Sequence, residues 1–242
     1  MNWLQTLYDN NSELFINLNY FIPTKFFEEC DINTPKFDSC LTKSFNDLRP
    51  LFKTGLPSLG IAPFDPHRSP YIEQRRGGSL LNYKLVLTNV SEYGWTQSEV
   101  TKTRLDKKRN RIVYSQYFPE KSLDGNYEFN GIFLGNNIIS KGVWNLTLYD
   151  YSQTTTVTRV GKSGGRLKVR VEIDRIGDMQ LHISNLLQGK KVLEGFLDSI
   201  INSAWQPGFA VIKPLINDLV STAFTDIFND SFRHFPLEEV IR

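Results

Sequence analysis

The sequence predicts an α+β fold: one elongated domain in which a strongly curved antiparallel sheet wraps around a long C-terminal amphipathic helix. Two observations predict it. Apolar residues alternate with a period of two from about residue 79 to 187, and a 3.6-residue apolar period then runs from about 190 onward. Because a single helix covers so long a sheet only if the sheet curls around it, we expect strong curvature.

Composition narrows the class of protein. A chain of 242 residues with 40% hydrophobic and 13% aromatic side chains can bury a sizeable core. Its 28 basic and 26 acidic residues are too balanced for a nucleic-acid partner. The sequence contains no run of about 18 apolar residues, so no membrane span is predicted. Residues 1–29 are expected to be an N-terminal extension without a recognisable signal peptide, and residues 30–242 the main domain.

Cys30 and Cys40 are the only cysteines, and the three histidines are scattered singly, so no metal site is expected. Two alternatives remain: a disulfide or two free buried thiols. A disulfide would contribute about 2 to 3 kcal/mol and would imply an oxidising compartment. Four sequons give weak support for secretion, at Asn10, Asn89, Asn145 and Asn229.

The first expected helix covers residues 38–54. Its apolar face consists of Leu41, Phe45, Leu48, Leu51 and Phe52. Asp38 or Ser39 is the expected N-cap, and Gly55 follows the C-terminal end. Pro50 should bend or shorten this helix because it has no amide hydrogen.

Strands follow, each with one apolar face. The alternating rows are Leu81, Tyr83, Leu85 and Leu87; Tyr127, Phe129, Gly131 and Phe133; Trp144, Leu146 and Leu148; and Leu167, Val169, Val171 and Ile173. Turns are expected at LDKKRN, SLDGN, GNN and GKSGG, which predicts an antiparallel meander.

The final helix carries two apolar stripes. The first consists of Val192, Leu193, Phe196, Leu197, Ile200 and Ile201, and the second of Phe209, Ile212, Leu215, Ile216, Leu219, Ala223, Ile227 and Phe228. Pro207 and Gly208 are expected to kink or break it, and Pro214 to bend it again. Some forty residues at about 1.5 Å each would span roughly 60 Å, which predicts an elongated molecule.

Three ordered segments resemble one family. CLTKSFNDLRPLFKTGLPSLGIAPFDP, FPEKSLDGNYEFNGIFLGNNIISKGVWNLTLYD and the tail from NSAWQ to LEEVI are similar to the takeout and juvenile-hormone-binding proteins of insects, over about residues 30 to 240. The resemblance implies a TULIP-like super-roll, a Cys30–Cys40 disulfide, and secretion into haemolymph or sensory fluid. It also implies a tunnel for a hydrophobic ligand, with no catalysis and no cofactor. LGNNIISKG and Pro207-Gly208 depart from the family pattern.

The expected tunnel wall combines the strand rows, the first helix and the final helix. Its residues are Phe45, Leu48, Phe52, Leu81, Tyr83, Leu85, Leu87, Tyr127, Phe129, Phe133, Trp144, Leu146, Leu148, Val169, Val171, Phe196, Ile200, Trp205, Phe209, Ile212, Leu215 and Leu219. Since no Lys or Arg is placed inside, a neutral ligand is preferred to a free fatty acid. Juvenile hormone, another terpenoid ester, a quinone or an alcohol would fit, with Tyr83 and Tyr127 as hydrogen-bond partners.

Other functions remain open. The basic run Lys102, Arg104, Lys107, Lys108, Arg109 and Arg111 is expected to be a solvated hairpin tip, or a contact for a receptor or anionic surface. Contact with an anionic surface would suit a lipid-transfer protein that docks on membranes without inserting stably into the bilayer. A secreted signalling protein with a filled core is another alternative. GKSGG matches G-x-S-x-G, so an esterase would depend on Ser163, but a turn between strands is the preferred interpretation. A monomer is expected.

Overall fold

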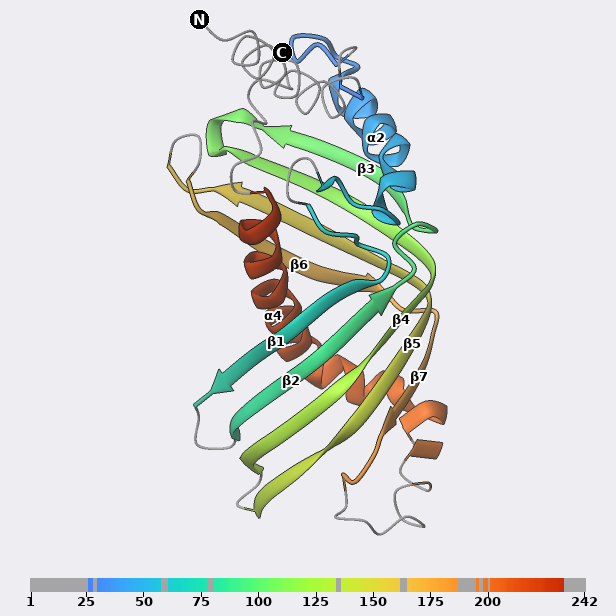
Figure 1. The fold of residues 1–242 in the computed structure, drawn as a ribbon, viewed down its shortest axis with the longest axis vertical. Helices are drawn as coiled ribbons and strands as arrows, with labels where there is room; N and C mark the ends of the chain where they lie inside the picture. Colours follow the sequence, from blue (N-terminus) through green and yellow to red (C-terminus); the bar gives the residue numbers. More distant parts are fainter. Residues whose placement is uncertain are drawn as a thin grey trace, which may run out of the picture.

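The computed structural model describes residues 26–27, 30–57, 61–77, 81–133, 136–161, 165–186, 195, 198–199 and 201–232. These residues form a single domain in which a seven-stranded antiparallel sheet curves around a C-terminal helix (Figure 1). The molecule is elongated, with the N-terminal helix at one end of the sheet. The α+β fold expected from the two periodicities is therefore confirmed.

The sheet consists of β1 (His67–Arg76), β2 (Leu81–Tyr93), β3 (Glu99–Asp106), β4 (Arg111–Phe133), β5 (Asn136–Arg159), β6 (Leu167–Arg175) and β7 (Asp178–Ile183). The two long strands β4 and β5 form its centre. β4 and β5 pair along their whole lengths. β3 pairs with the first part of β4 and β2 with the second, while β6 pairs with the C-terminal part of β5 and β7 with its middle. The sheet therefore has two differently built ends joined by β4 and β5.

The expected turn at SLDGN is wrong, because these residues lie within β4. The β2–β4 ladder is irregular after Thr88, where Asn89 adopts a φ of 53°. A Cβ on Gly125, opposite this bulge, would lie 3.1 Å from the Thr88 carbonyl oxygen and 3.3 Å from Trp144 Nε1. The glycine thus permits a close approach of strands at a bulge rather than a chain reversal. The other three segments lie at the β3–β4, β4–β5 and β5–β6 connections, but Asn136 and Asn137 of GNN already belong to β5.

The first helix is shorter than expected. α2 (Phe37–Asp47) is followed by the 3-10 helix η1 (Arg49–Phe52), which contains Pro50 near its start. The division follows from the missing amide hydrogen of Pro50. The N-cap position is Lys36 without a side-chain capping bond, so the expectation of Asp38 or Ser39 was wrong.

The final helix α4 (Trp205–Phe232) begins after a bend at Ala204 rather than breaking at Pro207-Gly208. Pro207 lies in the first turn, where no intrahelical amide bond is lost. Pro214 lies inside α4, and the helix changes direction along its length (Figure 1). Among the helices within the described ranges, none has the length and hydropathy needed to cross a membrane.

Polar side chains attach α4 to the free edge of β6. Residues at four-residue intervals accept hydrogen bonds from alternate backbone amides of the strand: Asn217 from Ile173, Ser221 from Val171, Thr225 from Val169 and Asn229 from Leu167, at 2.9 to 3.2 Å. Four helical residues rise about 6 Å and two strand residues about 6.8 Å, so the two spacings nearly match. The helix therefore protects an edge strand. Asn229, one of the sequon asparagines, is held in this ladder.

Candidate ligand-binding site

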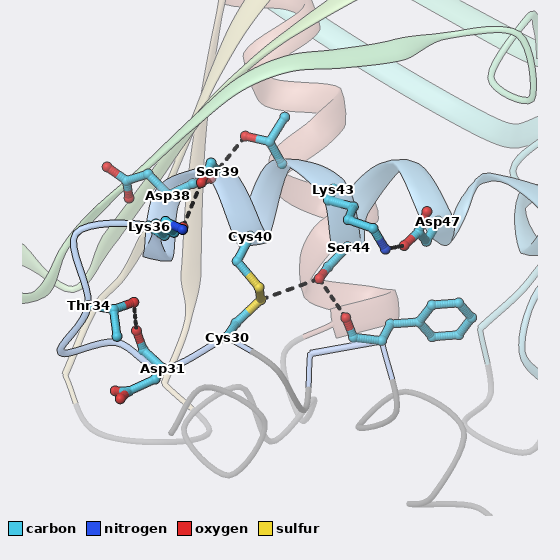
Figure 2. The surroundings of a disulfide bond; sticks show 12 residues. Cys30, Asp31, Thr34, Lys36, Asp38, Ser39, Cys40, Lys43, Ser44 and Asp47 are labelled. Atoms are coloured by element: carbon cyan, nitrogen blue, oxygen red, sulfur yellow. Dashed lines mark hydrogen bonds and ion pairs between the residues drawn. A yellow bond between two sulfur atoms is a disulfide. The ribbon is translucent and has the colours of Figure 1, made fainter.

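A disulfide ties the N-terminal arm to α2. Cys30 is bonded to Cys40, and the Ser44 hydroxyl lies 3.4 Å from Cys30 Sγ while donating to the Phe26 carbonyl oxygen at 2.5 Å (Figure 2). Phe27 and Leu41 are buried around this bridge. The bridge fixes the arm beside the cavity described next.

A cavity of about 620 Å³ lies at the end of the molecule that carries α2 and β3. Its wall comes from α2, η1, the loop before β1, the β3–β4 hairpin, the adjoining ends of β5 and β6, and the C-terminal end of α4. The lining residues are Phe27, Ile32, Phe45, Leu48, Leu51, Phe52, Gly55, Leu56, Ile61, Phe64, Trp95, Val100, Leu105, Asn110, Arg111, Ile112, Tyr114, Gln116, Val157, Arg159, Leu167, Phe228 and Phe232. The wall is largely apolar, as a hydrophobic ligand requires.

The structure places the expected wall residues in several environments. Phe45, Leu48 and Phe52 line the cavity. Six others belong to, or pack against, the central core: Leu146, Leu148, Val169, Val171, Trp205 and Phe209. Leu85, Leu87, Trp144, Leu215 and Leu219 are half-buried, and Ile212 is exposed. Phe196 and Ile200, and the side chains of Leu81 and Phe133, lie outside the described part of the chain.

The two expected tyrosine partners already have hydrogen bonds within the protein. Tyr83 donates to Gln74 Oε1 at 2.7 Å, and its ring stacks on Phe129. The Tyr127 oxygen lies 2.6 Å from Ser140 Oγ, and its hydroxyl donates to the Ser184 carbonyl oxygen at 2.8 Å. Both hydroxyls therefore hold the far end of the sheet together.

The middle of the molecule is filled by an ion pair inside an aromatic cluster. Lys121 Nζ lies 2.5 Å from Glu92 Oε1, and the two side chains are 5% and 8% exposed. The ammonium group also lies 4.3 Å and 4.2 Å from the ring centroids of Trp95 and Phe118. The expectation that no Lys lies inside was therefore wrong. This cluster closes the cavity toward the centre of the sheet, since Trp95 belongs to both.

The cavity wall also carries cationic and phenolic groups. Arg111 and Arg159 line it, and Arg111 Nη2 lies 3.1 Å from Asp106 Oδ2. Burial raises the pKa of Tyr114 to about 12, so this phenol stays neutral at physiological pH. The wall is therefore less uniformly apolar than the sequence rows suggested.

Sequence reasoning missed one wall strand. In β4 the residues Ile112, Tyr114 and Gln116 alternate along the cavity wall. The segment RIVYSQYF shows this period of two, so a signal was present. In contrast, GKSGG lies between the strands β5 and β6, whereas a nucleophile elbow joins a strand to a helix. Ser163 itself lies outside the described residues.

Comparisons with known proteins agree with this architecture. Residues 11–242 match the family model described as haemolymph juvenile hormone binding protein. The chain is 22% identical over 215 residues to the circadian clock-controlled protein daywake of Drosophila melanogaster, covering 84% of this chain and 83% of that protein. The crystal structure of Takeout 1 from Epiphyas postvittana is similar in fold, with a TM-score of 0.59 and 19% identity, covering 85% of this chain and 96% of that one. The chain belongs to the haemolymph juvenile hormone binding protein family.

Proposed function

We propose that the protein is an extracellular, non-catalytic carrier that holds a hydrophobic small molecule in the cavity between α2, β4 and the end of α4. The observation that carries this proposal is the cavity itself, about 620 Å³ in volume and lined mostly by aliphatic and aromatic side chains. The Cys30–Cys40 disulfide supports an oxidising, extracellular setting. Membership of a family named for hormone binding supports a carrier rather than an enzyme.

Hydrophobic burial supplies enough free energy for such binding. Fifteen methylene-sized groups at roughly 0.8 kcal/mol each would contribute about 12 kcal/mol. Association costs of about 4 kcal/mol or more reduce this figure. Micromolar or tighter affinity therefore follows without any charged contact.

A neutral ligand remains our proposal, but for a different reason than the absence of cations. Lys121 is neutralised by Glu92, and Arg111 is paired with Asp106. A ligand carboxylate that engaged either cation would have to compete with a carboxylate of the protein, at the cost of its own desolvation. Juvenile hormone, another terpenoid, a quinone or a long-chain alcohol remain suitable ligands.

Displacement of a fluorescent apolar probe by terpenoids and long-chain lipids tests the proposal, together with native mass spectrometry of protein secreted from insect cells. Co-purified lipid and probe displacement are the expected results. The bare polypeptide mass combined with no displacement would overturn the proposal.

A matched pair of substitutions locates the site. Leu48→Trp fills the cavity and should weaken probe binding at least tenfold, because the volume available to the probe shrinks. Leu87→Trp makes the same change on β2, at a half-buried position outside the cavity lining, and should leave binding near the wild-type value. The reverse pattern would place the ligand along the far end of the sheet.

One alternative has its own structural support. The β3–β4 hairpin exposes three basic side chains, Lys102, Arg104 and Lys108, and Arg111 at the start of β4 lines the cavity. A lipid-transfer protein could use this basic surface to face an anionic membrane. Salt-sensitive transfer of a fluorescent lipid between anionic vesicles would favour this alternative, whereas a passive carrier would release ligand at a rate independent of vesicle concentration.

A further inference from the structure

The described part of the chain contains three Asn-X-Ser/Thr triplets, the acceptor motif for N-linked glycans. They begin at Asn89, Asn145 and Asn229, whereas a fourth, at Asn10, lies outside the described residues. A glycan is attached to the side-chain nitrogen of the asparagine, Nδ2, and is bulky and hydrophilic. The surroundings of Nδ2 therefore decide whether the folded protein can carry a sugar at each triplet.

Asn229 uses its whole amide to hold α4 against β6. Its Nδ2 donates to the Leu167 carbonyl oxygen at 2.7 Å and to the Thr225 carbonyl oxygen at 2.6 Å. Its Oδ1 accepts from the Leu167 amide at 2.9 Å. A glycan on Nδ2 would replace one of the hydrogens that make these bonds, and would place a sugar where the helix meets the strand edge. A chain modified at Asn229 could not close this end of the ladder.

Asn89 lies at the bulge of β2. The β2–β4 ladder is interrupted between Thr88 and Ser91, and Asn89 adopts a φ of 53°, a left-handed conformation that asparagine tolerates better than most residues. Its side chain is exposed and has no hydrogen-bond partner among the residues that the structure describes. The amide is therefore open to solvent at a residue that the ladder leaves unpaired.

Asn145 lies in β5 and faces away from the core. Its neighbours Trp144 and Leu146 are half-buried, and Leu146 packs against the central core, whereas Asn145 is exposed. Because successive strand residues point to opposite faces, the Asn145 side chain points away from α4, which lies on the inner side of the curved sheet (Figure 1). Within the described ranges this side chain also has no hydrogen-bond partner. Its Nδ2 is therefore accessible too.

The two exposed triplets share one region of the sheet. Asp124 of β4 pairs with Ser91 of β2 on one side and with Asn145 of β5 on the other. Ser91 is the third residue of the Asn89 triplet. Neither asparagine belongs to the cavity lining, which lies at the α2 end of the molecule. Sugars at these positions would cover the middle of the sheet and leave the cavity end free.

We propose that Asn89 and Asn145 each carry an N-linked oligosaccharide and that Asn229 stays unmodified. This inference rests on the extracellular setting of the proposed function, because such glycans are added in the secretory pathway. In the transfer, Nδ2 attacks the anomeric carbon of an oligosaccharide that is bound to a lipid diphosphate. The bond from that carbon to the diphosphate oxygen breaks, the lipid diphosphate leaves, and Nδ2 loses one proton as the carbon–nitrogen bond forms.

Peptide mapping of the wild-type protein tests all three positions together. The full-length chain is directed into the secretory pathway of insect cells by an added leader, purified from the medium, and treated in heavy-oxygen water with a peptide-N-glycosidase that accepts insect glycans. The enzyme converts a glycosylated asparagine into a heavy-oxygen-labelled aspartate, which we expect at Asn89 and Asn145. Label at Asn229, or an unlabelled Asn89 or Asn145, would overturn the inference.

Substitutions assign each glycan to its triplet. Asn145→Gln and Ser91→Ala should each lose the mass of one glycan, and the double variant should lose the mass of two. Ser91→Ala replaces a change at Asn89 itself, because a glutamine would be strained at a φ of 53°. Asn130→Gln is the matched control, since Asn130 is an exposed asparagine of β4 outside any triplet, and it should keep both glycans. Full glycan mass in either triplet variant would overturn the inference.

Probe displacement on the same preparations separates this inference from the carrier function. Enzymatic removal of both glycans should leave probe affinity within about twofold of its starting value, because neither asparagine lines the cavity. Labelled Asn89 and Asn145 without any probe displacement would overturn the carrier function and support the inference. Unlabelled asparagines with normal probe displacement would overturn the inference and leave the carrier function intact.

Discussion

Lys121 Nζ lies 2.5 Å from Glu92 Oε1 in the middle of the sheet, and the neighbouring rings of Trp95 and Phe118 both lie within 4.3 Å of this ammonium group. Two neighbouring strands, β2 and β4, supply these charges. The attraction between them offsets the desolvation of both, and the aromatic rings add a cation–π contribution. The pair therefore links β2 to β4 in the middle of the sheet.

Removing one charge of this pair should be strongly destabilising. Lys121→Met leaves the Glu92 carboxylate buried and uncompensated, so the free energy of unfolding should fall by about 3 to 5 kcal/mol. The double variant Lys121→Met/Glu92→Leu should recover most of this loss. Urea unfolding followed by circular dichroism measures both values. Arg170→Met serves as the control, because the Arg170–Glu172 pair is exposed and should change stability by less than about 1 kcal/mol.

The ladder between α4 and β6 predicts a second effect. Thr225 Oγ1 accepts from the Val169 amide at 3.0 Å and lies 3.1 Å from its carbonyl oxygen. Thr225→Val keeps the side-chain shape but leaves these backbone groups without their partner, at a cost of about 1 to 3 kcal/mol. Faster hydrogen exchange at the Val169 amide is the local readout. Thr222→Val is the matched control, since Thr222 is exposed and bonds only to the Asp218 carbonyl of its own helix. Equal effects of the two substitutions would contradict this account.

The fold was predictable because apolar periodicity is a local property of each segment. The site, in contrast, depends on where the inward-facing residues of a strand change from one face to the other. Tyr127 and Phe129 face the same side of the sheet as Gln74, which reaches the Leu215 carbonyl oxygen of α4. Period-two alternation is sufficient to place them. Ile112 to Phe118 alternate correctly too, but both Pro119 and the residue after it are exposed, so the inward face shifts by one there. This shift turns Lys121 inward, and alternation within either half of β4 could not reveal it.

The position of the cavity was likewise not a local property. It depends on how α2, the loop before β1 and the end of α4 meet over the first part of β4. Phe64 illustrates the point: its ring lies 5.9 Å from Trp95 and 5.7 Å from Phe232, residues far apart in the sequence. A helical or strand period assigns each residue to one face of its element, but it gives no information on contacts between elements that are distant in the sequence.

The disulfide should support both stability and binding. Its loss in the Cys30→Ser/Cys40→Ser variant should lower the free energy of unfolding by about 2 to 3 kcal/mol, because the unfolded chain gains the entropy of an open loop. Phe27 and Ile32, which flank Cys30, line the cavity, so probe affinity should fall as well. Unfolding curves and probe titrations measure the two effects. Alkylation of unreduced protein is the control and should change neither. Unaltered stability after removal of the bridge would contradict the prediction.

His67 predicts a pH dependence of stability. Burial lowers the pKa of His67 below its usual 6.5, with smaller opposing contributions from Glu92, which raises it, and Lys121, which lowers it further. The folded protein therefore binds fewer protons than the unfolded chain as the pH falls below about 6.5. This contribution to stability is complete above that pH and is lost as the pH falls through the lower pKa of the folded state. Unfolding midpoints at about pH 7.5 and about pH 5.5 should differ less in His67→Gln than in the wild-type protein, because glutamine does not titrate. An identical difference in the two proteins would show that other groups account for the acid sensitivity.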